Sequence, residues 1–172
     1  MDFSTLTTFL DALKGKRSIP SVDCAVSLQG QRVYRHSANA GQDDLYFLYS
    51  VSKVITCAAA AQLLERGKLL LTDEICESLP EYRDMAVKRA DGQLEEAQTR
   101  ITVRHLFTMT AGLNYNLETE AIASAVRESG GRAPTREIAR AIAQGPLDFE
   151  PGAHWQYSLC HDVLAALVEA VS

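Results

Sequence analysis

The sequence predicts an α+β fold in which a helical lobe accompanies a small antiparallel sheet. Apolar residues recur at helical spacing over residues 3–13, and apolar and polar residues alternate over 22–28. From residue 51 onward the patterns are almost all helical. This order of helix, hairpin and then helices is typical of folds that segregate their strands and helices along the chain.

The first predicted elements are an amphipathic helix, which Gly15 follows, and a hairpin. Residues 22–28 and 31–37 are predicted to pair as antiparallel strands around the tight turn Gln29-Gly30. Two strands with one apolar face are not stable by themselves, so the sheet must find partners elsewhere.

After a loop over residues 39–44, residues 51–64 form a helix in which almost every residue is apolar or favours helix. Ser50 occupies the N-cap position, and Gly67 lies just past the end as a C′ residue. A helix that is apolar on all sides is usually buried at the centre of a domain. Lys53 is therefore out of place, because burying an ammonium is costly and lowers the pKa of a lysine.

Ser50 precedes Lys53 by three residues, on the same helical face and at the positive end of the helix dipole. This arrangement indicates a serine nucleophile with a lysine base. The string Ser-x-x-Lys alone occurs by chance in many proteins, where it is more often structural than catalytic. Its position at the head of a predicted buried helix favours the catalytic interpretation.

The remainder of the chain is predicted to be mostly helical. A short helix capped by Thr72 runs through Ser78 and is closed by Pro80, and the polar stretch 85–99 forms a surface hairpin or a loop. Further helices are predicted at 103–110 after a Thr102 cap, from Asn116 or Thr119 to Ser129, at 136–144 after a Thr135 cap, and at 162–171.

Composition and charge exclude several classes of protein. A chain of 172 residues suits one domain or one part of a larger one, and its net charge of −5 argues against general nucleic-acid binding. No apolar run is long enough to span a bilayer. The absence of a secretory signal and of any Cys-x-x-Cys pair predicts reduced thiols in a cytoplasmic protein. The histidines lack metal-ligand spacing, so neither a metal nor a cofactor is expected.

Four motifs follow one another along most of the chain: Ser50-Val51-Ser52-Lys53, residues 70–75 with 79–82 (LLTDEI and LPEY), residues 101–113 (ITVRHLFTMTAGL) and residues 149–159 (FEPGAHWQYSL). Together they resemble the serine β-lactamase-like superfamily, which includes class C β-lactamases, penicillin-binding DD-peptidases and family VIII esterases. The resemblance implies a β-lactamase/transpeptidase-like fold, of which residues 1–172 are the N-terminal part and in which the N-terminal hairpin is the only piece of the central sheet.

The resemblance implies catalytic roles for three residues. Ser50 matches the nucleophile that forms an acyl-enzyme, Lys53 matches the lysine that helps to deprotonate it, and Tyr157 matches the tyrosine that shuttles the proton. A phenol can do so only if cations such as Lys53 lower its pKa from about 10. The backbone N–H of Ser50 would form half of the oxyanion hole. Without the family, Tyr157 is more often a packing partner of Trp155, and His105 is expected to be a core or capping residue.

The chain departs from the family pattern in two places. Class C enzymes usually carry Tyr-x-Asn where this chain has Tyr157-Ser158-Leu159, and leucine has no amide to donate to a β-lactam side chain. Together with residues 161–164, this form is similar to the esterase and transesterase branch. The family's third motif, Lys or His followed by x-Gly on a late strand, is absent from residues 1–172.

Three functions are compatible with these motifs. The first is a serine hydrolase that acts through an acyl-enzyme, of esterase or transesterase type, on small carboxylic esters. The second is a β-lactam-hydrolysing or DD-peptidase-type relative that acts on a β-lactam or amide. The third is a catalytically incomplete fragment that acts as a binding or assembly module. An incomplete sheet would expose an apolar edge and face, so we expect a partner chain carrying the C-terminal half, or self-association, and no nucleic-acid or membrane partner.

Overall fold

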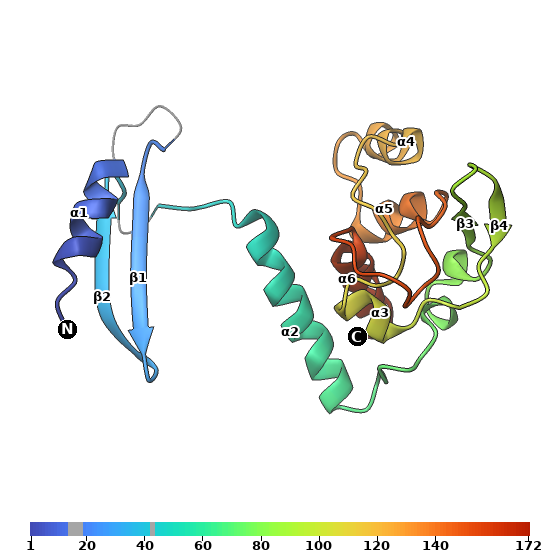
Figure 1. The fold of residues 1–172 in the computed structure, drawn as a ribbon, viewed down its shortest axis with the longest axis horizontal. Helices are drawn as coiled ribbons and strands as arrows, with labels where there is room; N and C mark the ends of the chain where they lie inside the picture. Colours follow the sequence, from blue (N-terminus) through green and yellow to red (C-terminus); the bar gives the residue numbers. More distant parts are fainter. Residues whose placement is uncertain (14–18, 42–43) are drawn as a thin grey trace. The chain divides into compact units, whose positions relative to one another are not determined.

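A computed structural model describes residues 1–13, 19–41 and 44–172. The predicted helix stop at Gly15 and residues 42–43 of the predicted loop lie outside these ranges. The chain divides into two compact units, Met1–Leu48 and Tyr49–Ser172. Figure 1 shows the elements of each unit.

The first unit consists of α1 (Ser4–Leu13) and a hairpin of β1 (Val22–Leu28) and β2 (Gln31–Ala38). The two strands pair antiparallel, with a register shift between Val26 and Ser27. Gln29 and Gly30 have φ values of 51° and 77°, and two positive φ values are what a type I′ hairpin turn requires. The helix and hairpin predicted for this region are confirmed.

Tyr34 joins α1 to the hairpin. Its ring stacks on Phe3 with 4.7 Å between centroids, and its hydroxyl lies 2.8 Å from Thr7 Oγ1. A second contact joins His36 Nε2 to Asp11 Oδ1 at 2.9 Å. α1 therefore packs against β2.

The second unit is mainly helical, and the predicted order of its elements is confirmed. It contains a 3₁₀ turn (Tyr49–Val51), α2 (Ser52–Glu65), two further 3₁₀ turns (Ile75–Glu77 and Pro80–Tyr82), the hairpin β3 (Ala86–Lys88) and β4 (Leu94–Glu96), α3 (Val103–Phe107), α4 (Glu120–Glu128), α5 (Thr135–Ile142) and α6 (Cys160–Val171). The hairpin is a separate two-stranded sheet that turns at Gly92, whose φ is 85°.

α6 lies at the centre of this unit. It packs against α2, α3 and α5, and its buried positions Val163, Leu164, Ala166 and Leu167 are each at most 1% exposed. These four residues fall in two adjacent pairs, 163–164 and 166–167, and together they form one broad apolar face of the helix. A buried hydrogen bond from the Tyr82 hydroxyl to the Ala139 carbonyl, 2.7 Å long, ties α5 to the 3₁₀ turns.

α2 is buried over only part of its length. Ala60 and Leu63 are buried, whereas Val54 and Ile55 are 69% and 61% exposed. The prediction that this helix is buried on all sides is therefore wrong for its first two turns. Its end is as predicted: Gly67 has a φ of 66°, and the N–H groups of Gly67 and Lys68 donate to the carbonyls of Leu64 and Leu63 in a Schellman motif.

The helix caps predicted at Thr72 and Thr135 are wrong. Thr72 begins no helix, because the Asp73 carboxylate accepts the N–H of Leu70 at 2.7 Å and closes a tight turn there. α5 begins at Thr135 itself, since Pro134 takes the cap position with an extended backbone. By contrast, Thr119 caps α4 as predicted, with its hydroxyl accepting the N–H of Ile122 at 3.3 Å.

His105 is a capping residue, one of the two roles expected for it. Its Nδ1 accepts the N–H of Thr102 at 3.1 Å, which satisfies a donor at the start of α3. All four cysteines are free, and Cys76 and Cys160 are buried. None of the helices in the described ranges combines the length and the apolar character needed to cross a bilayer.

Candidate active site

Ser50 lies on the 3₁₀ turn that leads into α2. The residue before it, Tyr49, has a φ of 46°, a left-handed conformation that is uncommon for a residue with a side chain and that concentrates at functional sites. The N-cap of α2 is Val51, which makes no side-chain cap bond, so the prediction that Ser50 is the cap is wrong. The Ser50 hydroxyl instead lies 2.5 Å from the hydroxyl of Tyr157.

Two backbone hydrogen bonds hold Tyr157 in place. On one side of it the N–H of Gln156 donates to the carbonyl of Met109, and on the other the N–H of Leu159 donates to the carbonyl of Asn114, both at 3.0 Å. The segment before α6 is thereby fixed to the loop after α3. The Tyr157 hydroxyl can reach Ser50 because α2 and α6 pack against each other.

Gly112 allows this loop and this segment to approach closely. Its φ is 82°, and a Cβ at this position would lie 2.2 Å from the carbonyl oxygen of Phe149. Its own carbonyl accepts the N–H of Asp148 at 2.8 Å. Only glycine satisfies both requirements, the positive φ and the absence of a side chain.

Lys53 lies in the first turn of α2, beside two aromatic rings. Its Nζ is 5.2 Å from the centroid of the Tyr157 ring and 5.5 Å from that of Tyr115. The two rings pack on each other with 5.2 Å between centroids. An ammonium within about 6 Å of a ring centroid is attracted to the face of the ring.

The electrostatics of the site lower the pKa of Tyr157. Hydrogen bonds to Ser50 and then to Lys53 lower the pKa of the Tyr157 hydroxyl, and the positive charge of Lys53 lowers it further. This agrees with the expectation that a neighbouring cation prepares the phenol for proton transfer.

The pKa of Lys53 itself is raised, not lowered as predicted. Burial alone would lower it, but the hydrogen bond to Tyr157 and the charge of Asp162 outweigh burial. The prediction failed because it assumed an apolar environment on every side, whereas Val54 and Ile55 beside Lys53 are exposed and the charge of Asp162 acts on its ammonium.

Sequence reasoning missed two residues of this site. Tyr115 packs on Tyr157, and only its position two residues past the third motif distinguishes it in the sequence. Asp162 lies in the first turn of α6, where acidic residues are common because they interact favourably with the helix dipole. Its sequence position therefore did not mark it as a site residue. The observation that singled out Lys53, a charged residue in an otherwise apolar helix, holds for Asp162 as well.

The interpretation of Tyr157 as a packing partner of Trp155 is not supported. The ring contact of Tyr157 is with Tyr115, and the side chain of Trp155 is 69% exposed. Met109, whose carbonyl accepts the N–H of Gln156, is buried.

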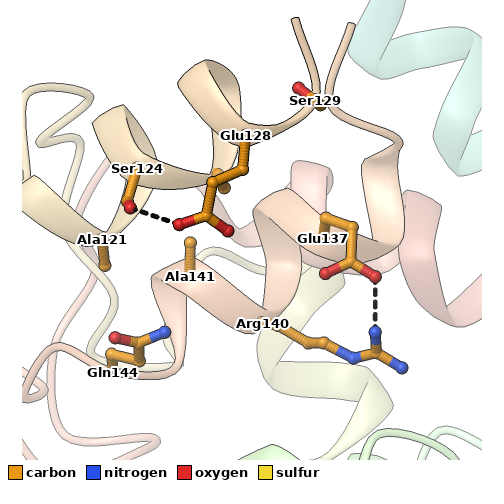
Figure 2. Close-up of a pocket in the computed structure, with 9 residues that line it drawn as sticks. Ala121, Ser124, Glu128, Ser129, Glu137, Arg140, Ala141 and Gln144 are labelled. Carbon is orange, nitrogen blue, oxygen red and sulfur yellow. Dashed lines mark hydrogen bonds and ion pairs between the residues drawn. The ribbon is translucent and has the colours of Figure 1, made fainter.

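A cleft of about 500 Å³ lies elsewhere in this unit, between α4 and α5. Figure 2 shows its lining, in which Ser124 bonds to Glu128 and Arg140 pairs with Glu137. None of the residues that line it belongs to the group around Ser50. In the part of the chain that the structure describes, no three His, Cys, Asp or Glu side chains are grouped so that they could hold a metal ion.

Comparison with known proteins places these residues in context. A family model described as "Beta-lactamase" matches residues 6–172. "Esterase EstB" of Burkholderia gladioli is 34% identical over 190 residues, covering 98% of this chain and 46% of that protein. "Lovastatin esterase" of Penicillium rubens is 29% identical, covering 96% of this chain and 46% of that protein. The chain thus spans about half the length of these curated relatives.

Solved structures resemble the chain along its whole length. A D-stereospecific amidohydrolase from Streptomyces sp. matches with a TM-score of 0.72 and 25% identity, over 100% of this chain and 50% of that protein. EstCE1, described as a hydrolase with promiscuous acyltransferase activity, matches with a TM-score of 0.70 and 25% identity, over 98% of this chain and 47% of that protein.

Proposed function

Because the chain belongs to the β-lactamase family, we propose that it carries the acylation centre of a serine hydrolase of esterase or transesterase type. The resemblance inferred from the four motifs, and the β-lactamase/transpeptidase-like fold that it implies, are confirmed by the family match and the solved structures. The observation that carries the proposed function is the 2.5 Å contact between Ser50 Oγ and the Tyr157 hydroxyl, with Lys53 beside the Tyr157 ring.

In the proposed mechanism Tyr157 acts as the base and Ser50 as the nucleophile. The Tyr157 phenolate takes the hydroxyl proton of Ser50 while Oγ attacks the carbonyl carbon of the ester. The ester C–O bond then breaks, Tyr157 gives its proton to the departing alcohol, and the acyl group stays on Ser50. Tyr157 next takes a proton from water or a second alcohol, whose oxygen attacks the acyl carbonyl carbon. The bond to Ser50 Oγ then breaks, Tyr157 returns the proton to Oγ, and the acid or a new ester leaves.

Lys53 and the Ser50 backbone supply the electrostatic part of this mechanism. The Lys53 ammonium stabilises the Tyr157 phenolate, which is the state that accepts the proton. The Ser50 N–H is assigned to one half of the oxyanion hole, where it stabilises the charge that develops on the carbonyl oxygen.

Small carboxylic esters are the proposed substrates. Leu159 replaces the amide that would bind a β-lactam side chain, and it is buried against Ile122 and Ala141, so it presents no polar group to a ligand. The names of the two curated relatives, which are esterases, support the same class. The alternative is an amide or β-lactam substrate, which the similarity to an amidohydrolase favours.

Residues 1–172 are proposed to be the N-terminal part of the hydrolase domain, in keeping with the half of each relative that the chain spans. The exposed residues Val54 and Ile55 belong to an apolar surface of α2, and a groove of about 220 Å³ beside them is lined by Ile55, Thr56, Ala59, Ala165 and Val168. We propose that a C-terminal segment supplied in cis or by a second chain covers this surface, or that two copies associate through it. If Ser50 cannot be acylated, the alternative is that the chain acts as an assembly module through this surface.

A cytoplasmic location is part of the proposal, because four free cysteines suit a reducing compartment. Cell fractionation tests it, and recovery of the protein outside the cytoplasm would contradict it.

The proposed function is tested by covalent labelling with a fluorophosphonate probe. Ser50→Ala should abolish the adduct seen by intact mass spectrometry, and Ser52→Ala, two residues further along the chain, should keep it. Labelling that survives Ser50→Ala would refute the nucleophile assignment. Parallel assays with a p-nitrophenyl ester and with nitrocefin should show ester turnover, and nitrocefin turnover alone would favour the β-lactam alternative.

A further inference from the structure

Asp162 carries a buried carboxylate oxygen whose role the mechanism above does not explain. It lies in the first turn of α6, five residues after Tyr157 in the sequence. Its Oδ2 is shielded from solvent and accepts no hydrogen bond within the described ranges. A buried carboxylate is costly unless a cation or donors compensate it, so the position calls for a charged partner.

A cation whose charge acts on this carboxylate is on the neighbouring helix. Burial raises the pKa of the Asp162 carboxyl. α6 packs against α2, and the charge of Lys53 opposes this rise and favours the ionised form. His161, the other basic group near this carboxylate, faces elsewhere: its Nε2 lies 3.7 Å from Cys57 Sγ and 3.4 Å from the carbonyl of Phe107. Among the described residues, the titratable groups that interact with the charge of Asp162 are Lys53 on α2, Tyr82, Tyr157, and Cys160 and His161 on α6.

We propose that Asp162 is a positioning residue whose carboxylate holds Lys53 as an ammonium beside the Tyr157 ring, so that Ser50 gives its proton to Tyr157 and not to Lys53. The inference rests on the proposed function and decides between its two candidate bases. A lysine that stays protonated cannot accept a proton, but it stabilises the phenolate that can.

The effects of Asp162 on its two neighbours have the same sign. Its negative charge raises the pKa of Lys53 and also that of Tyr157, whose pKa is lowered overall by its hydrogen bonds to Ser50 and Lys53. Removing the carboxylate charge should therefore lower both pKa values. A residue that served only to pack α6 against α2 would change neither pKa in a specific direction.

The experiment is an NMR titration of the whole chain with carbon-13-labelled tyrosine and lysine, assigned with Tyr157→Phe and Lys53→Arg. In Asp162→Asn the pKa values of Tyr157 and Lys53 should both fall. Glu169→Gln removes an exposed carboxylate from the same helix and should leave both values unchanged. Unchanged values in a folded Asp162→Asn protein would overturn the proposal.

The reciprocal titration covers the case in which Asp162→Asn does not fold. Lys53→Met should raise the pKa of Asp162, followed through its labelled carboxyl carbon, whereas Lys68→Met, three residues past the end of α2, should not. An Asp162 pKa that does not move in Lys53→Met would refute the coupling. These titrations need no acylation, so an unlabelled Ser50 would refute the proposed function without affecting them.

Discussion

Alanine at Gly112 should destabilise the second unit more than alanine at any glycine with open space around it. Gly112 has a φ of 82°, and a Cβ there would lie 2.2 Å from the carbonyl oxygen of Phe149 and 3.1 Å from Leu147 Cβ. The nearer atom belongs to the backbone, so it cannot move aside as a flexible side chain would.

The size of the effect follows from two contributions. The left-handed backbone disfavours alanine by about 1 kcal/mol, and forcing an extra carbon into a close-packed site costs about 1–3 kcal/mol. The free energy of unfolding should therefore fall by about 2–4 kcal/mol. Gly92 has a similar φ of 85° but no atom within 4 Å of the added carbon, so Gly92→Ala should lose only about 1 kcal/mol.

Urea denaturation followed by far-ultraviolet circular dichroism measures both variants. Equal losses in Gly112→Ala and Gly92→Ala would mean that the approach of Phe149 does not constrain this loop, and would refute the reasoning. Because the same loop holds Tyr157 through Met109, the Gly112 variant should also label more slowly at Ser50.

Three further predictions concern the site, the α3 cap and the exposed face of α2. Tyr157→Phe should slow fluorophosphonate labelling of Ser50 by about 10²–10⁴-fold. The labelling rate of the wild type should rise with pH through the lowered pKa of Tyr157 and then level off. A labelling rate that changes neither with the substitution nor with pH would exclude Tyr157 as the base. Burial, and then the charge of a neighbouring arginine, lowers the pKa of His105 below its ordinary 6.5, so its contribution to stability is complete above that pH and is lost as the pH falls through the folded-state pKa. His105→Gln keeps an acceptor for the Thr102 N–H without titrating, so the loss of unfolding free energy in acid should be smaller, and an unchanged loss would contradict this. Val54→Lys should change the unfolding free energy by no more than about 0.5 kcal/mol while weakening association in light scattering, and a folded variant that associates as strongly as the wild type would refute a partner at this face.

Local features were predictable from the sequence because their causes lie within a few residues. Gly67 ends α2 through backbone bonds to the preceding turn, and Thr119 caps α4 through a residue three positions away. The turn Gln29-Gly30 likewise needs only its own two positive φ values. Thr72 failed as a cap because the neighbouring Asp73 carboxylate already accepts a backbone N–H and closes a competing turn.

The site depends on contacts that the sequence pattern could not reveal. The Ser50 hydroxyl contacts Tyr157, which is 107 positions away, and this contact takes the place of the cap that local reasoning assigned to it. The apolar character of α2 likewise gave no information on which faces are covered, so the direction of the Lys53 pKa shift was predicted with the wrong sign. The family motifs identified Ser50, Lys53 and Tyr157 as partners, and the structure brings the three together, whereas Asp162 emerged only from its buried oxygen.

The most direct test of the account is mass spectrometry of the protein quenched while it hydrolyses p-nitrophenyl acetate. An acyl group should be found on the peptide that contains Ser50, and it should be absent in Ser50→Ala. Its formation should be slower in Tyr157→Phe, because the base is missing. Acylation of another residue, or a folded protein that forms no acyl adduct with the ester, would contradict the assignment of Ser50 as the nucleophile.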